Sequence, residues 1–154
     1  MVARVFLSDD MSNFPKADII ATGLALFHDK GKYPDFLGHY GRFERNQQAL
    51  NSQLHKIHIA FSNRDSDLPT WQNKRGSART CDNFVIYVQH FFEDECFQLL
   101  GVVTPDAHNK IDKLLPYFIE KAEKFHKLTK MQLSSMPFFD STNLKIMKEI
   151  RLTD

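Results

Sequence analysis

The chain has 154 residues, of which 42% are hydrophobic and 25% charged, so it is long enough for one soluble domain with a full core. Its net charge of +1 creates no overall positive field, and a nucleic-acid partner would therefore need a local basic patch. Cys81 and Cys96 form neither a disulfide framework nor a metal-binding spacing. The N-terminus lacks the pattern of a signal peptide, and no apolar run is long enough to span a membrane. Together these features indicate a cytoplasmic protein.

The first third of the chain is predicted to form a strand followed by two helices. The apolar run Val2–Leu7 favours a strand. Helical spacing of apolar residues then predicts a helix that begins near Pro15 and ends at Gly31. Residues 33–38 are typical of a turn, and the polar stretch Arg42–Gln53 predicts a second helix.

The middle of the chain is predicted to hold three consecutive strands. The stretch Leu54–Ser62 alternates between apolar and polar residues, as a strand does. A polar, basic loop follows over Asn63–Asp82. The stretch Asn83–Thr104 predicts a hairpin with its tip at Glu93–Glu95, because acidic residues there interrupt two apolar runs.

The last part of the chain is predicted to be helical and then to leave the domain. Thr104 is the expected cap of a helix opened by Pro105, and Pro116 is expected to kink or divide that helix. Residues 131–154 are expected to form an extension that ends in a short amphipathic piece over 144–150.

The order β-α-α-β-β-β-α predicts an α+β fold with an antiparallel four-stranded sheet. We expect the helices to pack on one face of the sheet only. We assign residues 1–130 to this domain and residues 131–154 to the extension.

The free face of the predicted sheet is expected to be polar. In the strand after Leu54, Ile57 and Ile59 share one face and Lys56 and His58 share the other. In the next strand, Tyr87 and Gln89 are expected to join that polar face, since Ile86 and Val88 point away from it. Such a surface suits acid–base chemistry or ligand binding, although a structural tyrosine on a half-exposed sheet is the plainer interpretation of Tyr87.

Two histidines are candidates for general acid and base. His58 lies in the middle of its strand, and His108 lies one turn into the last predicted helix, whose N-terminus attracts anions. Taken alone, each is more often a half-exposed or capping histidine bonded to a neighbour.

The loop between the first two central strands carries cations without acids. Lys74, Arg75 and Arg79 lie in a segment with Gly76 and Thr80, and arginine binds phosphate oxygens through two parallel hydrogen bonds. A loop of this length in a small domain is often functional, while a solvated loop is the alternative.

No metal site is expected. His55 and His58 have a spacing that serves a metal only on a helix, and in a strand they face opposite ways. The sequence also lacks a phosphate-binding glycine loop and the motif of a serine hydrolase, so we expect no cofactor.

The chain resembles the YafO family of toxins from bacterial type II toxin–antitoxin systems. The resemblance runs in unbroken order from Tyr33 to Leu128. It rests on the segments Pro34-Asp-Phe-Leu-Gly38, Leu54-His-Lys-Ile-His-Ile-Ala60, Ala78-Arg-Thr-Cys-Asp82, Val85-Ile-Tyr-Val-Gln89, Phe92-Glu-Asp-Glu95, Pro105-Asp-Ala-His108 and Ile119-Glu-Lys-Ala-Glu-Lys-Phe125. It implies a RelE-like fold and a ribosome-associated mRNA interferase that a cognate antitoxin neutralises.

We therefore predict metal-independent RNA cleavage through attack by the ribose 2′-hydroxyl. His58 and His108 are the expected base and acid, Tyr87 an acid or orienting group, and Arg79 the phosphate clamp. The residues expected to contact RNA are Lys56, Lys74, Arg75, Thr80 and Gln89. Two other readings remain open, namely a non-catalytic binder that blocks translation by occupying ribosome or RNA, and an interaction module that docks a partner helix.

Overall fold

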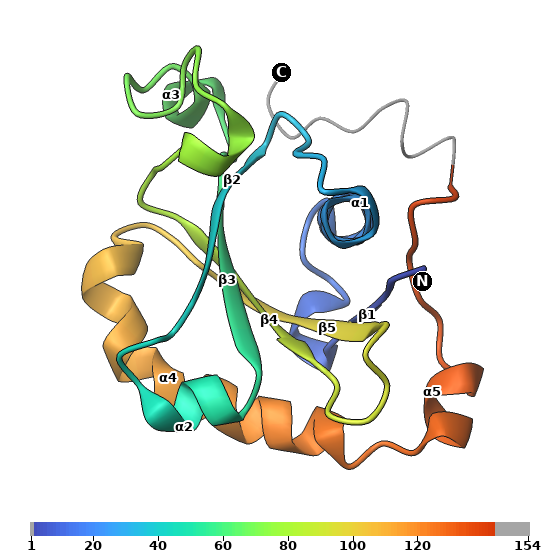
Figure 1. Cartoon of the computed structure of the whole chain (residues 1–154). Coiled ribbons are helices and arrows are strands. Elements are labelled where there is room, and N and C mark those ends of the chain that lie inside the picture. The colour runs from blue at the N-terminus through green and yellow to red at the C-terminus, as the bar shows by residue number, and fades with distance from the viewer. Residues whose placement is uncertain (1, 144–154) are drawn as a thin grey trace.

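The computed structural model describes residues 2–143 and shows a mixed α+β domain built on one sheet (Figure 1). The strands are β1 Arg4–Leu7, β2 Leu37–Arg42, β3 Leu54–Ile59, β4 Phe84–Gln89 and β5 Cys96–Val103. The helices are α1 Ala17–Lys30, α2 Gln47–Asn51, α3 Asn63–Ser66, α4 Ala107–His126 and α5 Lys130–Ser135, with single 3-10 turns η1 at Asp9–Met11 and η2 at Gly76–Ala78.

The sheet has five strands in the order β1-β5-β4-β3-β2, so the prediction of four antiparallel strands is wrong in the number of strands and in the direction of β1. β1 pairs with β5 in parallel, whereas the other neighbours are antiparallel. The missed strand is β2, which falls where a turn and a polar helix were expected. Its residues include Gly38 and Gly41, which have low strand propensity, so pairing with β3 must fix its conformation.

Helices cover both faces of the sheet, and the expectation of a single covered face is wrong. Figure 1 shows α1 on one side and α4 on the other. The strand β4 explains this, because every residue from Phe84 to Val88 is buried. Ile20 and Leu24 of α1 pack with Val85, and Leu115 and Phe118 of α4 pack with Ile86.

The helix α4 is continuous through Pro116, so the expected division of this segment is wrong. A proline inside a helix removes one backbone hydrogen bond, and the buried residues Leu115 and Phe118 hold the helix on the sheet on both sides of it. The helix begins at Ala107 rather than at Pro105. Asp82, not the expected Thr104, serves its first turn by accepting the backbone N–H of His108.

The extension begins with α5 and then runs along the outer edge of β1 (Figure 1). Leu133 is fully buried in the core on the α4 side. Val5 and Phe139 exchange two backbone hydrogen bonds of 2.9 Å, so the segment after α5 covers the edge of the sheet. The amphipathic piece expected over 144–150 lies outside the described residues. Among the described residues, no helix is long and apolar enough to cross a membrane.

Candidate active site

His58 and Lys56 of β3 share one face of the sheet, as the alternation of its residues predicted, but this face is the one that α4 covers and not a free face. The first turn of α4 brings His108 to the same place. The imidazole rings of His58 and His108 lie 5.7 Å apart between centroids. The centroid of each imidazole lies 4.8 Å from that of the Phe84 ring in a T-shaped arrangement, so one buried aromatic residue of β4 supports the pair. The two histidines expected to act as acid and base are thus neighbours.

His58 is held at one ring nitrogen and buried around the rest of its ring. Its Nδ1 lies 2.8 Å from the carbonyl oxygen of Cys81 and 3.2 Å from the N–H of the same residue. Only 6% of the residue is exposed, and burial lowers the pKa of His58 to about 4. The imidazole is therefore neutral near pH 7, as a general base must be.

His108 is oriented by a carboxylate, a residue that the sequence analysis did not single out. Its Nδ1 lies 2.6 Å from Oδ1 of Asp82, and that oxygen also accepts the backbone N–H of His108. Desolvation opposes ionisation of Asp82, but the hydrogen bonds from the backbone and side chain of His108 hold its pKa below the usual value. Because Nδ1 is engaged, Nε2 of His108 is the nitrogen available to a substrate.

A third histidine, His39 of β2, also escaped the sequence analysis. Its ring centroid lies 6.2 Å from that of His58, and its exposed side chain contacts the carbonyl oxygen of Ser77 through Nδ1 at 3.0 Å. The position was missed because β2 itself was missed. Gly38 beside it has no room for a side chain, since a Cβ atom there would lie 2.5 Å from the carbonyl oxygen of Arg79.

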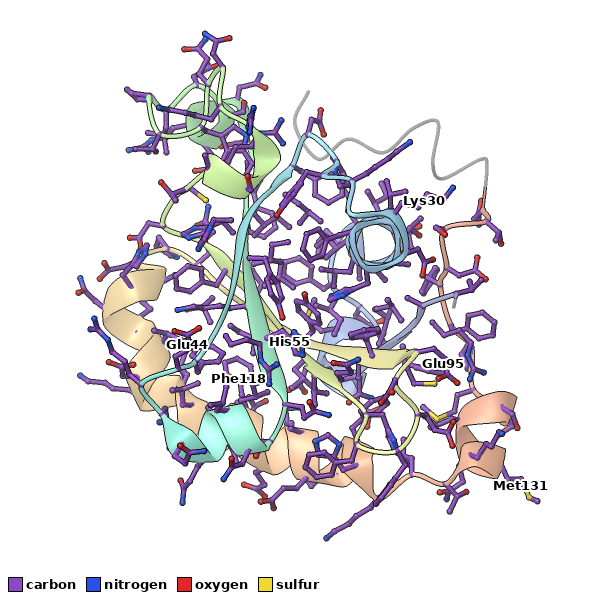
Figure 2. All side chains as sticks on the ribbon, in the orientation of Figure 1. Lys30, Glu44, His55, Glu95, Phe118 and Met131 are labelled. Carbon is purple, nitrogen blue, oxygen red and sulfur yellow. The ribbon has the colours of Figure 1, made fainter. Side chains whose placement is uncertain are left out.

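Lys56 connects the histidine pair to a cavity of about 520 Å³ between β2 and α4. We call it the β2–α4 cavity, and it is lined by Arg42, Phe43, Glu44, Arg45, Asn46, Lys56, Ile111, Asp112 and Leu115. The Nζ atom of Lys56 lies 5.0 Å from the ring centroid of Phe43 and 5.3 Å from that of Phe84. Burial lowers the pKa of Lys56, while attraction from Asp112 and Glu44 opposes the shift. Figure 2 shows Glu44 on the side of the sheet where α4 lies.

The basic loop divides into exposed and structural cations. Lys74 and Arg75 are exposed and available to an anion. Arg79 is half-buried: its Nη1 donates to the carbonyl oxygens of Pro34 and Leu37 at 3.1 Å, and its Nε donates to that of Lys74. The expected clamp is thus bound to the backbone and ties the loop to the start of β2.

Two further expected residues lie apart from the histidine pair. Thr80 is joined to Thr70, whose hydroxyl donates to its carbonyl oxygen at 2.7 Å. Gln89 lies at the end of β4 and donates to the carbonyl oxygen of Asp94 in the hairpin at 2.8 Å. Among the described residues, no hydrogen bond joins either residue to His58 or His108.

Tyr87 lies on the opposite face of the sheet from His58, so the prediction that they share a polar face is wrong. In the antiparallel pairing of β3 with β4, Tyr87 stands opposite His55, whereas Phe84 stands opposite His58. Tyr87 is fully buried, and its hydroxyl lies 2.7 Å from Nε2 of His28. The prediction failed because the sequence of a single strand shows neither how that strand pairs with its neighbour nor whether both of its faces are buried.

His55 and His58 face opposite ways, as the spacing predicted. His55 lies near the centre of the molecule (Figure 2), stacked on Tyr87 at 5.1 Å. Within residues 2–143, no group of three or more His, Cys, Asp or Glu side chains is arranged to hold a metal ion.

A comparison with protein families gives a match over most of the described domain. The model of the family described as "Toxin YafO, type II toxin-antitoxin system" matches residues 25–127, which is about two thirds of the chain. The chain belongs to this toxin family. The resemblance inferred from the segments between Tyr33 and Leu128 is thereby confirmed, and membership implies a cognate antitoxin as partner. No curated protein and no solved structure matches the chain.

Proposed function

We propose that this toxin is an endoribonuclease that cleaves mRNA at the ribosome and so inhibits translation. The observation that carries the proposal is the pair of histidines 5.7 Å apart, one buried and neutral, the other exposed and oriented by a carboxylate. A neutral buried imidazole beside an exposed imidazole with a fixed orientation provides two groups that can exchange protons with a substrate.

In the proposed reaction, His58 accepts the proton of a ribose 2′-hydroxyl through Nε2 while Nδ1 stays bonded to Cys81. The 2′-oxygen attacks the adjacent phosphorus, and the bond from phosphorus to the 5′-oxygen breaks. His108 donates a proton from Nε2 to that leaving oxygen, while the Asp82 carboxylate binds Nδ1 and so orients the ring. The products are a 2′,3′-cyclic phosphate and a 5′-hydroxyl end. Two histidines supply both proton transfers, so the proposed step uses no metal ion.

Cations around the pair are proposed to hold the RNA backbone. Lys56 lies beside Phe84 on the same face of the sheet, and its lowered pKa follows from burial. Lys74 and Arg75 extend from the exposed basic loop, which reaches the site through the contact of His39 with Ser77. Local cations of this kind serve a chain whose net charge is only +1.

The test is to induce the toxin without antitoxin and to map new RNA ends in wild-type cells and in cells that carry His58→Ala or His108→Ala. We expect new 2′,3′-cyclic phosphate ends in messages, lost in both variants while the proteins stay folded. Asn109→Ala, an exposed change next to His108, is the control and should keep cleavage. Growth arrest without new ends would contradict the proposal and favour inhibition by occupancy.

A further inference from the structure

The β2–α4 cavity is a candidate for a second binding site, and it adjoins the histidine pair. Lys56 lines the cavity and also lies over the ring of Phe84, which supports both His58 and His108. A polymer whose phosphate lies at the histidines would therefore place a neighbouring nucleotide at the cavity mouth. The volume of about 520 Å³ falls within the range of about 300–1,000 Å³ for small-ligand pockets.

The walls of the cavity carry unpaired charges of both signs. Glu44 and Asp112 supply carboxylates, and Arg45 and Lys56 supply cations. The ion pairs found within residues 2–143 all lie elsewhere, so none of these four groups is engaged in one. Arg42, by contrast, is already bound to the carbonyl oxygens of Leu50 and Leu54 and serves the fold.

The floor of the cavity is apolar and partly aromatic. Phe43 is buried to 6% exposure and packs in the core on the α4 side, together with Ile111 and Leu115. Planar bases lie well against aromatic and aliphatic side chains, and their polar edges are then read by hydrogen bonds. A ligand that matches this cavity has a flat apolar face, an anionic group and a polar edge rich in donors.

We infer that the β2–α4 cavity holds a guanine base next to the scissile phosphate, an inference that rests on the proposed function. Guanine is the RNA base whose pairing edge offers two adjacent donors, the ring N–H and the exocyclic amine, to the oxygens of one carboxylate. Adenine and cytosine place an acceptor nitrogen beside their single amine, which a carboxylate repels. Asp112 and Glu44 are the candidate carboxylates, and Arg45 and Lys56 are placed to contact the phosphate.

The first test needs no cleavage. The full-length toxin is titrated with guanosine, adenosine, cytidine and uridine 5′-monophosphates, and binding is followed by NMR shifts. We expect guanosine monophosphate to bind roughly tenfold more tightly than the others. Asp112→Asn and Glu44→Gln should reduce or abolish this preference, because an amide turns one acceptor into a donor. Asp94→Asn on the hairpin and Glu120→Gln on α4, both exposed and outside the cavity, should keep it.

The second test maps cleavage ends for the same variants. Asp112→Asn is expected to lower the share of cuts next to guanine while cutting itself continues.

Equal binding of the four nucleotides, binding of none of them, or a preference that survives both substitutions would overturn the inference even if RNA is still cut. If the protein preferred guanosine monophosphate but cut no RNA, the proposed nuclease activity would be wrong while the assignment of the cavity to guanine would stand. Weaker antitoxin binding by Asp112→Asn with unchanged nucleotide binding would assign the cavity to the protein partner. Melting temperatures show whether each variant is folded.

Discussion

Two clusters of histidines lie on opposite faces of the same strand, and their surroundings give them different chemistry. On the α4 side, His58, His39 and His108 meet at a place that solvent reaches, because His39 and His108 are exposed. On the α1 side, His28 and His55 are enclosed with aromatic rings. The exposure of His39 and His108, rather than residue type, distinguishes the face proposed to act on RNA from the face that serves the fold.

The enclosed cluster is a neutral polar network. Tyr87 contacts His28, and the hydroxyl of Tyr40 contacts Nδ1 of His55. Burial lowers the pKa of His28 to about 4 and that of His55 to about 2, so both rings stay uncharged near pH 7. Within residues 2–143, the buried Nε2 of His55 has no hydrogen-bond partner at ordinary bonding distance, and Gln89 is a further polar side chain that interacts with this ring.

Parallel substitution of the two histidines of β3, one on each face, is the strongest test of the difference between the clusters. We expect His58→Ala to reduce the cleavage rate of folded protein by about 10²–10⁴-fold, because a general base is lost. His55→Ala should instead lower the free energy of unfolding and leave the rate per folded molecule within about twofold. Chemical denaturation and single-turnover cleavage separate the two effects. Equal loss of cleavage rate in both variants would show that the enclosed cluster takes part in catalysis.

The sequence predicted the helices and strands whose own residues show a helical or alternating pattern of apolar side chains. α1, β3, β4, β5 and α4 follow from local alternation or helical spacing, and the opposite directions of His55 and His58 follow from the strand geometry alone. The strand β2 could not be predicted in this way, because its glycines interrupt the alternation of apolar and polar side chains. Its pairing with β3 fixes it as a strand. The role of Asp82 was equally hidden, since it depends on α4 folding back onto the loop before β4.

Truncation after Lys130 tests whether the far edge of the sheet supports the active face. The change removes the buried side chain of Leu133 and the backbone pairing of Phe139 with Val5. We expect the free energy of unfolding to fall by about 3–5 kcal/mol, and the melting temperature with it, since a buried side chain such as Leu133 contributes about 1.5–3 kcal/mol and the partly buried Met136 and Phe139 are lost as well. The folded fraction should still cleave RNA. A stable truncated protein without cleavage would place the extension in the active site.

Acid should weaken the fold through the buried histidines. Below about pH 6.5 the unfolded chain binds protons at His55 and His58 while the folded chain does not, because their folded pKa values are about 2 and about 4. Stability is therefore full above about pH 6.5 and is lost as the pH falls toward 4. At about pH 5 the loss is about 2 kcal/mol for each group. Urea denaturation at several pH values measures it, and His55→Asn should remove about half of the dependence that these two residues cause. If the free energy of unfolding of His55→Asn changed with pH as steeply as that of the wild type, His55 would not be buried in its neutral form.

Arg79 tests how the basic loop is fixed beside the open face. Arg79→Ala leaves the carbonyl oxygens of Pro34, Leu37 and Lys74 without their donor, and we expect a loss of about 2 kcal/mol in the free energy of unfolding. Toxicity should fall as the loop moves. Arg79→Lys keeps the charge but cannot reach three carbonyl groups, so its stability should also fall. A stable Arg79→Lys protein with restored toxicity would instead support the phosphate clamp.

The smallest expected effect belongs to Tyr87, the one expected catalytic residue that the structure places in the enclosed cluster. Its side chain is fully buried, and burial raises the pKa of Tyr87 well above the usual value, so the phenol stays protonated. Tyr87→Phe keeps the ring but leaves Nε2 of His28 without its partner. We expect a loss of about 1 kcal/mol in the free energy of unfolding and a cleavage rate within about twofold of the wild type. Tyr117→Phe on the exposed surface of α4 is the matched control and should change stability less. A large loss of cleavage rate in folded Tyr87→Phe, with Tyr117→Phe unaffected, would mean that the two faces communicate across β4 and that their separation is incomplete.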